Sequence, residues 1–163
     1  MIKIDVFNDR ILETSKVNLL EQSEHEWDHY TGQSLGRSVD YWGAILSIHD
    51  DAHVDVLYRW APRTYCHFHR HIAPTSSIVL EGELHVYDYV DAKEVGHRVR
   101  TVGDYAHKDA VEDHIEQGGP EGALVMFSLF APDGVLTQRL DDDGFILQSI
   151  TVEMLQKRQA GIL

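Results

Sequence analysis

The chain has 163 residues, 43% of them hydrophobic and 25% charged, with a formal net charge of −13 and a single cysteine, Cys66. This composition predicts one globular domain over residues 1–163 and excludes an internal disulfide. The acidic excess argues against binding to nucleic acid or anionic lipid, and no apolar run approaches the roughly 20 residues that span a bilayer. With no secretory signal pattern either, we expect a cytoplasmic protein.

The first 40 residues predict an irregular or partly helical arm. A helix is expected over residues 19–30, with Asn18 as a candidate N-cap. This arm is expected to wrap either the rest of the domain or a partner subunit.

From residue 42 to about 150, short apolar runs alternate with turn residues, which is the pattern of an antiparallel sandwich or barrel. A parallel α/β fold would need helical crossovers, and this region has none. Turns are predicted at residues 81–82 and 118–120, among others. The predicted strands are residues 43–49, 53–60, 65–71, 76–82, 83–89, 97–102, 122–130, 135–140 and 145–150.

The carboxy-terminal residues 151–163 predict a short helix. Thr151 is a candidate N-cap, and Gly161 follows the last helical residues. This is the one helix that the sequence predicts outside the amino-terminal arm.

Histidine is unusually frequent, with 11 copies, and three of them alternate along one predicted strand at His67, His69 and His71. Successive side chains of a strand point to opposite faces, so these three would share a face. Neutral imidazoles are good ligands for Zn, Fe, Ni and Cu. Two of them at this spacing can bind one ion, but a rigid site needs a third ligand from elsewhere.

The histidine strand resembles the first motif of the cupin superfamily. In that motif a His-x-His pair precedes a glycine, and counting back from Gly82 places the pair at His69 and His71. The usual glutamate ligand would fall at Thr75. The resemblance therefore implies a site of three histidines in place of a four-ligand His/Glu site.

A second segment is similar to the second cupin motif, in which a third histidine follows a glycine by eleven residues. Here these residues are Gly103 and His114, whereas the proline and glycine of the usual turn are replaced by Asp109 and Val111. The two motifs resemble those of the branch that includes 2,4′-dihydroxyacetophenone dioxygenase and acetylacetone-cleaving enzymes. The resemblance covers about residues 42–140.

This resemblance implies a double-stranded β-helix, the cupin jelly-roll barrel, with one divalent transition metal bound by His69, His71 and His114. Fe(II) is favoured, and Zn or Ni are alternatives. The implied activity is that of a dioxygenase that uses O2 to cleave a C–C bond in a small diketone or hydroxyaryl ketone. The alternatives are a non-catalytic metal or small-molecule sensor, similar to anti-sigma cupins, and a metal-dependent lyase or hydrolase. By analogy we expect a homodimer.

Four more residues are candidates for supporting roles. Asp88 is expected to point towards the metal and to accept a bond from a ligand histidine, or else to be a charged residue at the open end of a strand. His67 is an extra ligand, a donor that orients a metal-bound group, or a residue at the barrel mouth without a role. Arg59 could bind a substrate carboxylate or pair with surface acids, and His107 is a candidate for the pocket entrance.

Overall fold

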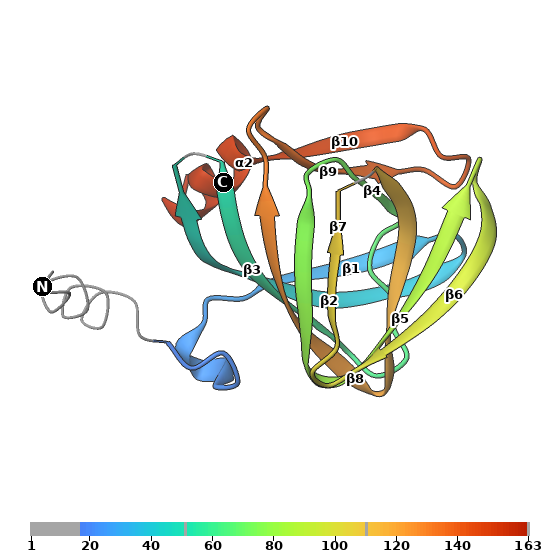
Figure 1. The fold of residues 1–163 in the computed structure, drawn as a ribbon, viewed down its shortest axis with the longest axis horizontal. Coiled ribbons are helices and arrows are strands. Elements are labelled where there is room, and N and C mark those ends of the chain that lie inside the picture. Colours follow the sequence, from blue (N-terminus) through green and yellow to red (C-terminus); the bar gives the residue numbers. More distant parts are fainter. Residues whose placement is uncertain (1–16, 51, 110, 163) are drawn as a thin grey trace, which may run out of the picture.

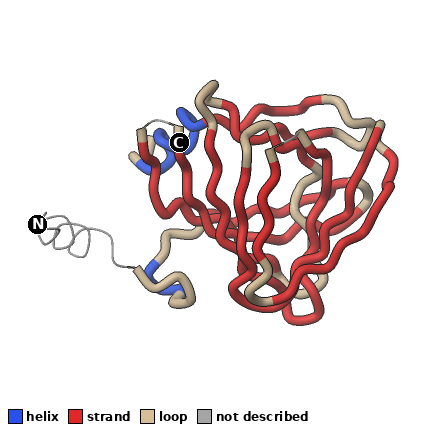
Figure 2. Tube along the Cα trace, viewed as in Figure 1, coloured by secondary structure: helices blue, strands red, loops and turns tan. Residues whose placement is uncertain are grey.

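The computed structural model describes residues 17–50, 52–109 and 111–162, which form a curled antiparallel sheet and a carboxy-terminal helix (Figures 1 and 2). This confirms the predicted all-β barrel with a short terminal helix. The elements in chain order are η1 (Gln22–Glu24), β1 (Asp28–Ser34), β2 (Arg37–His49), β3 (His53–Trp60), β4 (His69–His71), β5 (Thr75–Val90), β6 (Lys93–Thr101), β7 (Tyr105–Lys108), β8 (Glu112–Phe130), β9 (Val135–Leu140), β10 (Ile146–Thr151) and α2 (Val152–Gln159).

The longest strand, β8, joins the two halves of the sheet. One edge of β8 pairs with β5 along most of its length, and the other edge pairs with β3 and then with β4. The strand order from one end is β1-β2-β3-β8-β4-β9-β10, while β6 and β7 pair with β5. The histidine strand β4 therefore lies between β8 and β9 in the sheet, in the upper part of the barrel as drawn (Figure 1).

Buried and less buried residues alternate along the central strands, which is why these runs form a sheet with one face on the core. Along β5, for example, Leu84 and Val86 are 0% and 3% exposed and point inward. Phe68, next to the histidine strand, and Ile115 of β8 are also fully buried. The core thus surrounds the segment that carries the histidines and holds it in place.

Two glycines, Gly82 and Gly122, allow β5 and β8 to pass close to each other where a turn was predicted at residues 81–82. A Cβ atom on Gly82 would lie 2.2 Å from the carbonyl oxygen of Gly122, and both residues have positive φ, +67° and +83°. The prediction of separate strands at residues 76–82 and 83–89 is therefore wrong: β5 is continuous, with register shifts around Gly82. Residues 118–120, also predicted as a turn, lie inside β8.

The prediction of a helix over residues 19–30 is wrong, and the sheet begins at residue 28, well before residue 42. The described part of this region has only the short η1, and β1 then pairs with β2 through a two-residue turn in which Leu35 and Gly36 have φ of +51° and +69°. Such turns favour a tight hairpin. Ring stacking supports the pairing, with the ring centroids of Tyr30 and Tyr41 4.9 Å apart. Cross-strand packing thus outweighs local helix propensity.

The carboxy-terminal helix is confirmed. Thr151 caps α2, since its Oγ1 accepts a hydrogen bond of 3.2 Å from the backbone N–H of Met154. Val152 and Leu155 are buried, so one face of the helix packs on the barrel.

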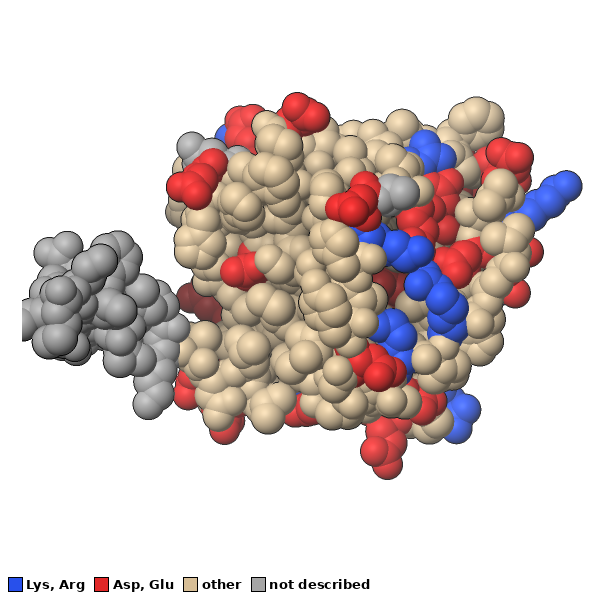
Figure 3. Space-filling model, in the orientation of Figure 1, with Lys and Arg blue, Asp and Glu red and all other residues tan. Residues whose placement is uncertain are grey.

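Acidic side chains occur on both halves of the face shown in Figure 3, whereas the basic side chains gather mainly on its right half, next to acidic ones. The larger number of acidic side chains agrees with the formal net charge of −13. Among the helices in the described residues, none is long and apolar enough to cross a membrane.

Candidate metal centre

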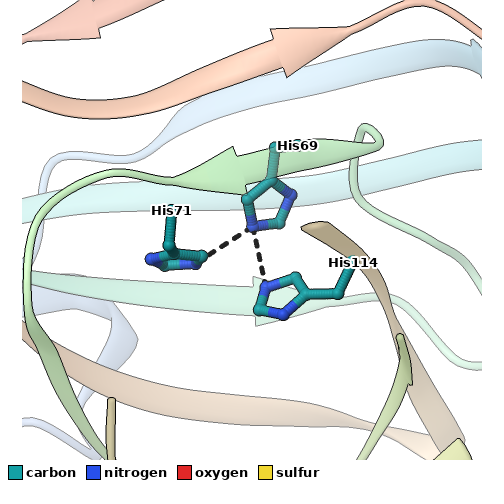
Figure 4. Close-up of side chains that lie close together, drawn as sticks. All are labelled: His69, His71 and His114. Carbon is teal, nitrogen blue, oxygen red and sulfur yellow. Dashed lines mark hydrogen bonds between the residues drawn. The ribbon is translucent and has the colours of Figure 1, made fainter. Parts of the chain in front are cut away.

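Three histidine rings meet at one point inside the barrel. His69 and His71 stand on β4, and His114 stands on β8 as the cross-strand partner of His69. The Nε2 atom of His69 lies 3.1 Å from Nε2 of His71 and 3.1 Å from Nε2 of His114 (Figure 4). Strand alternation aligns the first two rings, and the ladder with β8 brings the third to them.

A hydrogen-bond acceptor faces the outer nitrogen of His69 and of His114. Nδ1 of His69 lies 2.7 Å from the main-chain carbonyl oxygen of His67, and Nδ1 of His114 lies 3.0 Å from Oε1 of Glu112. A neutral imidazole that donates from Nδ1 carries a lone pair on Nε2. In its neutral form each of these two rings therefore presents a lone pair to the point where they meet.

The third ring, His71, is held in the same way by Thr75. Nδ1 of His71 lies 3.1 Å from Oγ1 of Thr75, and this hydroxyl donates its own proton to the carbonyl oxygen of Ala73 at 2.8 Å. Thr75 can therefore only accept from His71, whose Nε2 keeps a lone pair. The residue at the usual glutamate position thus orients a histidine in this chain.

The spacing of the three nitrogens fits a bound transition metal. Two nitrogens that lie 3.1 Å apart subtend about 95° at an ion about 2.1 Å from each of them. This angle is close to that between adjacent octahedral positions. Ligand atoms of all three residues lie within 4.8 Å of one another, and imidazole donors suit Zn, Fe, Ni and Cu.

Burial keeps two of the rings neutral. Desolvation, reinforced by His114, lowers the pKa of His69 to about 4 and holds that of His71 well below its ordinary value. Burial acts in the same direction on His114, but Glu116 and Glu112 together outweigh it and raise the pKa of His114. The two carboxylates therefore create a field that favours positive charge at this side of the site.

Glu116, which the sequence analysis did not select, lies beside the rings. Its side chain is buried, with Oε1 3.6 Å from Nε2 of His114 and Oε2 3.9 Å from Nε2 of His69. Among the described residues, no lysine or arginine forms an ion pair with it, and its other contact is the Cys66 thiol, 3.7 Å away. Because a buried carboxylate is unfavourable without a cation, Glu116 is a second indication of a cation site.

The sequence spacing of Glu112 and Glu116 around His114 could have indicated that both residues lie near the metal site. They precede and follow His114 by two residues, so strand alternation puts all three side chains on one face. The signal depends on knowing that β8 begins at Glu112, whereas the sequence predicted a strand only from residue 122.

Asp88 faces the site as expected, but its hydrogen bonds go elsewhere. It is the cross-strand partner of His114, and its carboxylate accepts bonds of 2.9 and 2.7 Å from Nε and Nη2 of Arg98. Arg98 also donates to Glu112. The prediction that Asp88 accepts a bond from a ligand histidine is therefore wrong: Glu112 does so, and Arg98 links the two carboxylates.

A cavity of about 350 Å³ opens beside the histidines. His67 lines this cavity: its Nδ1 lies 3.1 Å from the Tyr41 hydroxyl, and burial lowers its pKa to about 4. Its carbonyl, and not its ring, contacts His69. The aromatic part of the cavity wall consists of Tyr30, Tyr41, Tyr58, Trp60 and Phe127, and α2 contributes Met154, Leu155 and Arg158.

Arg59 and His107, predicted to contact substrate, lie outside this cavity. Arg59 alternates with inward-facing Tyr58 and Trp60 on β3, so it points outward, where it pairs with Glu81 at 3.2 Å. His107 is exposed on β7 and lies 2.7 Å from the Ser76 hydroxyl. Both predictions are corrected by the strand positions, which turn these side chains away from the cavity.

Comparison with known proteins identifies the fold. No protein-family model and no curated protein matches the sequence. A candidate acetylacetone dioxygenase from Methylibium petroleiphilum has a TM-score of 0.65 and 16% identity, and the match covers 89% of this chain and 95% of that one. An acetylacetone dioxygenase from Acinetobacter johnsonii has a TM-score of 0.64 and 12% identity, and the match covers 91% of this chain and 92% of that one. An RmlC-like cupin protein from Ralstonia eutropha has a TM-score of 0.64 and 13% identity, and the match covers 93% of this chain and 89% of that one.

Identities this low carry information on the fold alone. The strand arrangement and these matches together agree with the resemblance that the two histidine motifs predicted. The chain has the RmlC-like cupin fold.

Proposed function

We propose that the protein is a metal-dependent dioxygenase that cleaves a C–C bond in a small diketone or hydroxyaryl ketone. His69, His71 and His114 hold one divalent transition metal, Fe(II) in the active form. The observation that carries the proposal is the convergence of three Nε2 lone pairs, each fixed by an acceptor at Nδ1, beside a buried carboxylate and a cavity. Two structures with the same fold are described as acetylacetone dioxygenases, one of them as a candidate, which supports this reaction class.

The cavity fits a small substrate. Ligand cavities commonly have about 300–1,000 Å³, so a volume of about 350 Å³ suits a molecule of the size of a short diketone. When bound, an Fe(II) ion supplies Lewis acidity towards an oxygen pair and a place for O2. The protein's aromatic wall keeps bulk water away from the reacting molecule and so strengthens the electrostatic effects within the site.

Glu116 is placed to take a proton from the substrate. A diketone must lose a proton to become its enolate, and a base within reach of the cavity accelerates this step. The Glu116 carboxylate lines the cavity and lies next to two of the histidines. In this mechanism Oε1 or Oε2 of Glu116 accepts the proton, and the neighbouring Cys66 thiol, kept protonated because burial raises its pKa, donates a hydrogen bond to Oε2.

The function is tested by metal analysis of the purified protein followed by oxygen-electrode assays with acetylacetone and a hydroxyaryl ketone. We expect about one iron per chain and O2 consumption equal to the substrate consumed. Tight zinc without turnover would support a sensor instead, and turnover without O2 would support a lyase or hydrolase. Either result would overturn the dioxygenase proposal.

Thr75→Val is expected to weaken metal binding by about tenfold, because outer partners of metal-bound histidines typically contribute tenfold to a hundredfold. The substitution keeps the shape of the side chain but removes the hydroxyl that accepts from Nδ1 of His71. Metal affinity is measured by competition with a chelator of known affinity. Thr31→Val, at an exposed position on β1, is the control, and equal affinities of the two variants would contradict the role of Thr75.

Glu116→Gln is expected to retain the metal and to lower kcat for an enolisable diketone by about a hundredfold or more, in the range of general base catalysis. The amide keeps the size of the side chain and removes its basicity. Metal content and kcat are measured on the same preparation. An unchanged kcat with full metal content would show that another group accepts the proton.

A further inference from the structure

A row of directly paired polar residues crosses four neighbouring strands, and three of its members, His69, Arg139 and Gln148, line the cavity. His114 of β8 pairs across the ladder with His69 of β4, His69 pairs with Arg139 of β9, and Arg139 pairs with Gln148 of β10. Directly paired residues of adjacent strands share a face, with Cβ atoms about 5 Å apart. Arg139 and Gln148 both line the cavity, so a guanidinium stands beside the histidines on the side away from β8.

Arg139 has no acidic partner among the described residues. Five other arginines form ion pairs with carboxylates, and Arg100 donates to Ser77 and to the carbonyl oxygen of Asp104. For Arg139 the contact that the structure records is with the ring of Tyr30, whose centroid lies 5.5 Å from the guanidinium carbon. The five ion-paired arginines are Arg37, Arg59, Arg70, Arg98 and Arg158.

This lack of an acidic partner is notable in such an acidic chain. The sequence has 27 Asp and Glu against 14 Lys and Arg, so carboxylates are in excess, yet within the described chain none pairs with this half-buried cation. The carboxylate of the site, Glu116, contacts His69 and His114 from β8, whereas Arg139 approaches His69 from β9. The two charges thus stand on opposite sides of the same histidine.

We propose, as an inference that rests on the proposed function, that the substrate carries a carboxylate and that Arg139 binds this carboxylate. A guanidinium presents a planar pair of N–H donors that matches both oxygens of a carboxylate. The substrate class is then a small oxo acid, in which a diketone or hydroxyketone group faces the histidines and the carboxylate faces Arg139. The aromatic wall, including Tyr41 and Tyr58, packs against the carbon chain between them.

The proposal is tested with two ligands that differ only in the carboxylate: acetylacetone and 2,4-dioxopentanoate. Both are titrated anaerobically by calorimetry into iron-loaded wild-type protein, Arg139→Gln and Arg63→Gln. Arg63 is an exposed arginine outside the cavity, so its variant makes the same change in charge. We expect wild type and Arg63→Gln to bind the dioxopentanoate about tenfold to a hundredfold more tightly than acetylacetone, and Arg139→Gln to lose this preference.

Equal affinity of the wild type for the two ligands, or a preference that survives Arg139→Gln, would overturn the proposal. The same titrations on the metal-free protein separate this inference from the metal site. A preference for the dioxopentanoate there that disappears in Arg139→Gln upholds the carboxylate site by itself. Acetylacetone affinity that does not respond to iron would overturn the proposed function while leaving the role of Arg139 to be decided by the metal-free comparison.

Discussion

The His114→Ala variant is expected to lose more than about a hundredfold in metal affinity while its barrel stays folded. Removal of an outer partner of a metal-bound histidine already lowers affinity by about tenfold to a hundredfold, and His114 supplies one of the three converging lone pairs itself. The remaining pair, His69 and His71, stands on one strand and cannot close the site alone. Metal content after dialysis and circular dichroism measure the two effects.

His107→Ala is the matched control for this experiment. His107 is exposed, and its ring contacts Ser76 and Asp109 away from the cavity, so its loss is expected to leave the metal content unchanged. Full metal occupancy in the His114→Ala variant would show that β8 does not supply the third ligand. An equal loss of metal in both variants would point to a general effect on the fold.

The Phe68→Ala variant is expected to lower the free energy of unfolding by about 3–5 kcal/mol, the usual effect of truncating a buried phenylalanine. Phe68 is fully buried beside the histidine strand, and its ring centroid lies 4.9 Å from that of Tyr89. For a chain of this length the melting temperature should fall by roughly 10 °C. The change in melting temperature is measured by calorimetry or by thermal denaturation of the metal-free protein.

Phe145→Ala makes the same change at a side chain that is 71% exposed, so its effect on stability is expected to stay within about 0.5 kcal/mol. A similar loss of stability in the two variants would contradict the packing described for Phe68. Metal binding to the Phe68→Ala variant is expected to weaken as well, because Phe68 separates His67 from His69 in the chain and anchors the start of β4 in the core.

Local patterns predicted the parts of this protein that depend on neighbours in the chain. Strands β3 and β9 match their predicted bounds, since alternating apolar residues bounded by turn residues determine a half-buried strand. The same holds for α2, whose cap Thr151 lies next to the helix. The resemblance of the segments around Gly82 and Gly103 to the two cupin motifs likewise predicted that His69, His71 and His114 lie together.

Long-range pairing decided what the local patterns predicted wrongly. Residues 28–34 form β1 because they pair with β2, and the short β7, which the sequence did not predict, forms along β5. Gly82 permits a bulge in a continuous strand because the backbone of Gly122 passes directly over it. A turn and a bulge share the same residue types, and only the strand that lies opposite distinguishes them.

Strand periodicity was enough to predict the all-β fold, and the resemblance to the two cupin motifs was enough to predict the three histidines, because both depend only on short distances along the chain. The charged groups that lie beside those histidines became apparent from the three-dimensional arrangement of the strands. The Nδ1 partners lie within four residues of their histidines in the chain. The approach of Glu116 and of Arg139 to His69, by contrast, depends on which strands lie side by side. Ladder register is a property of two distant segments, so no single stretch of the chain contains it.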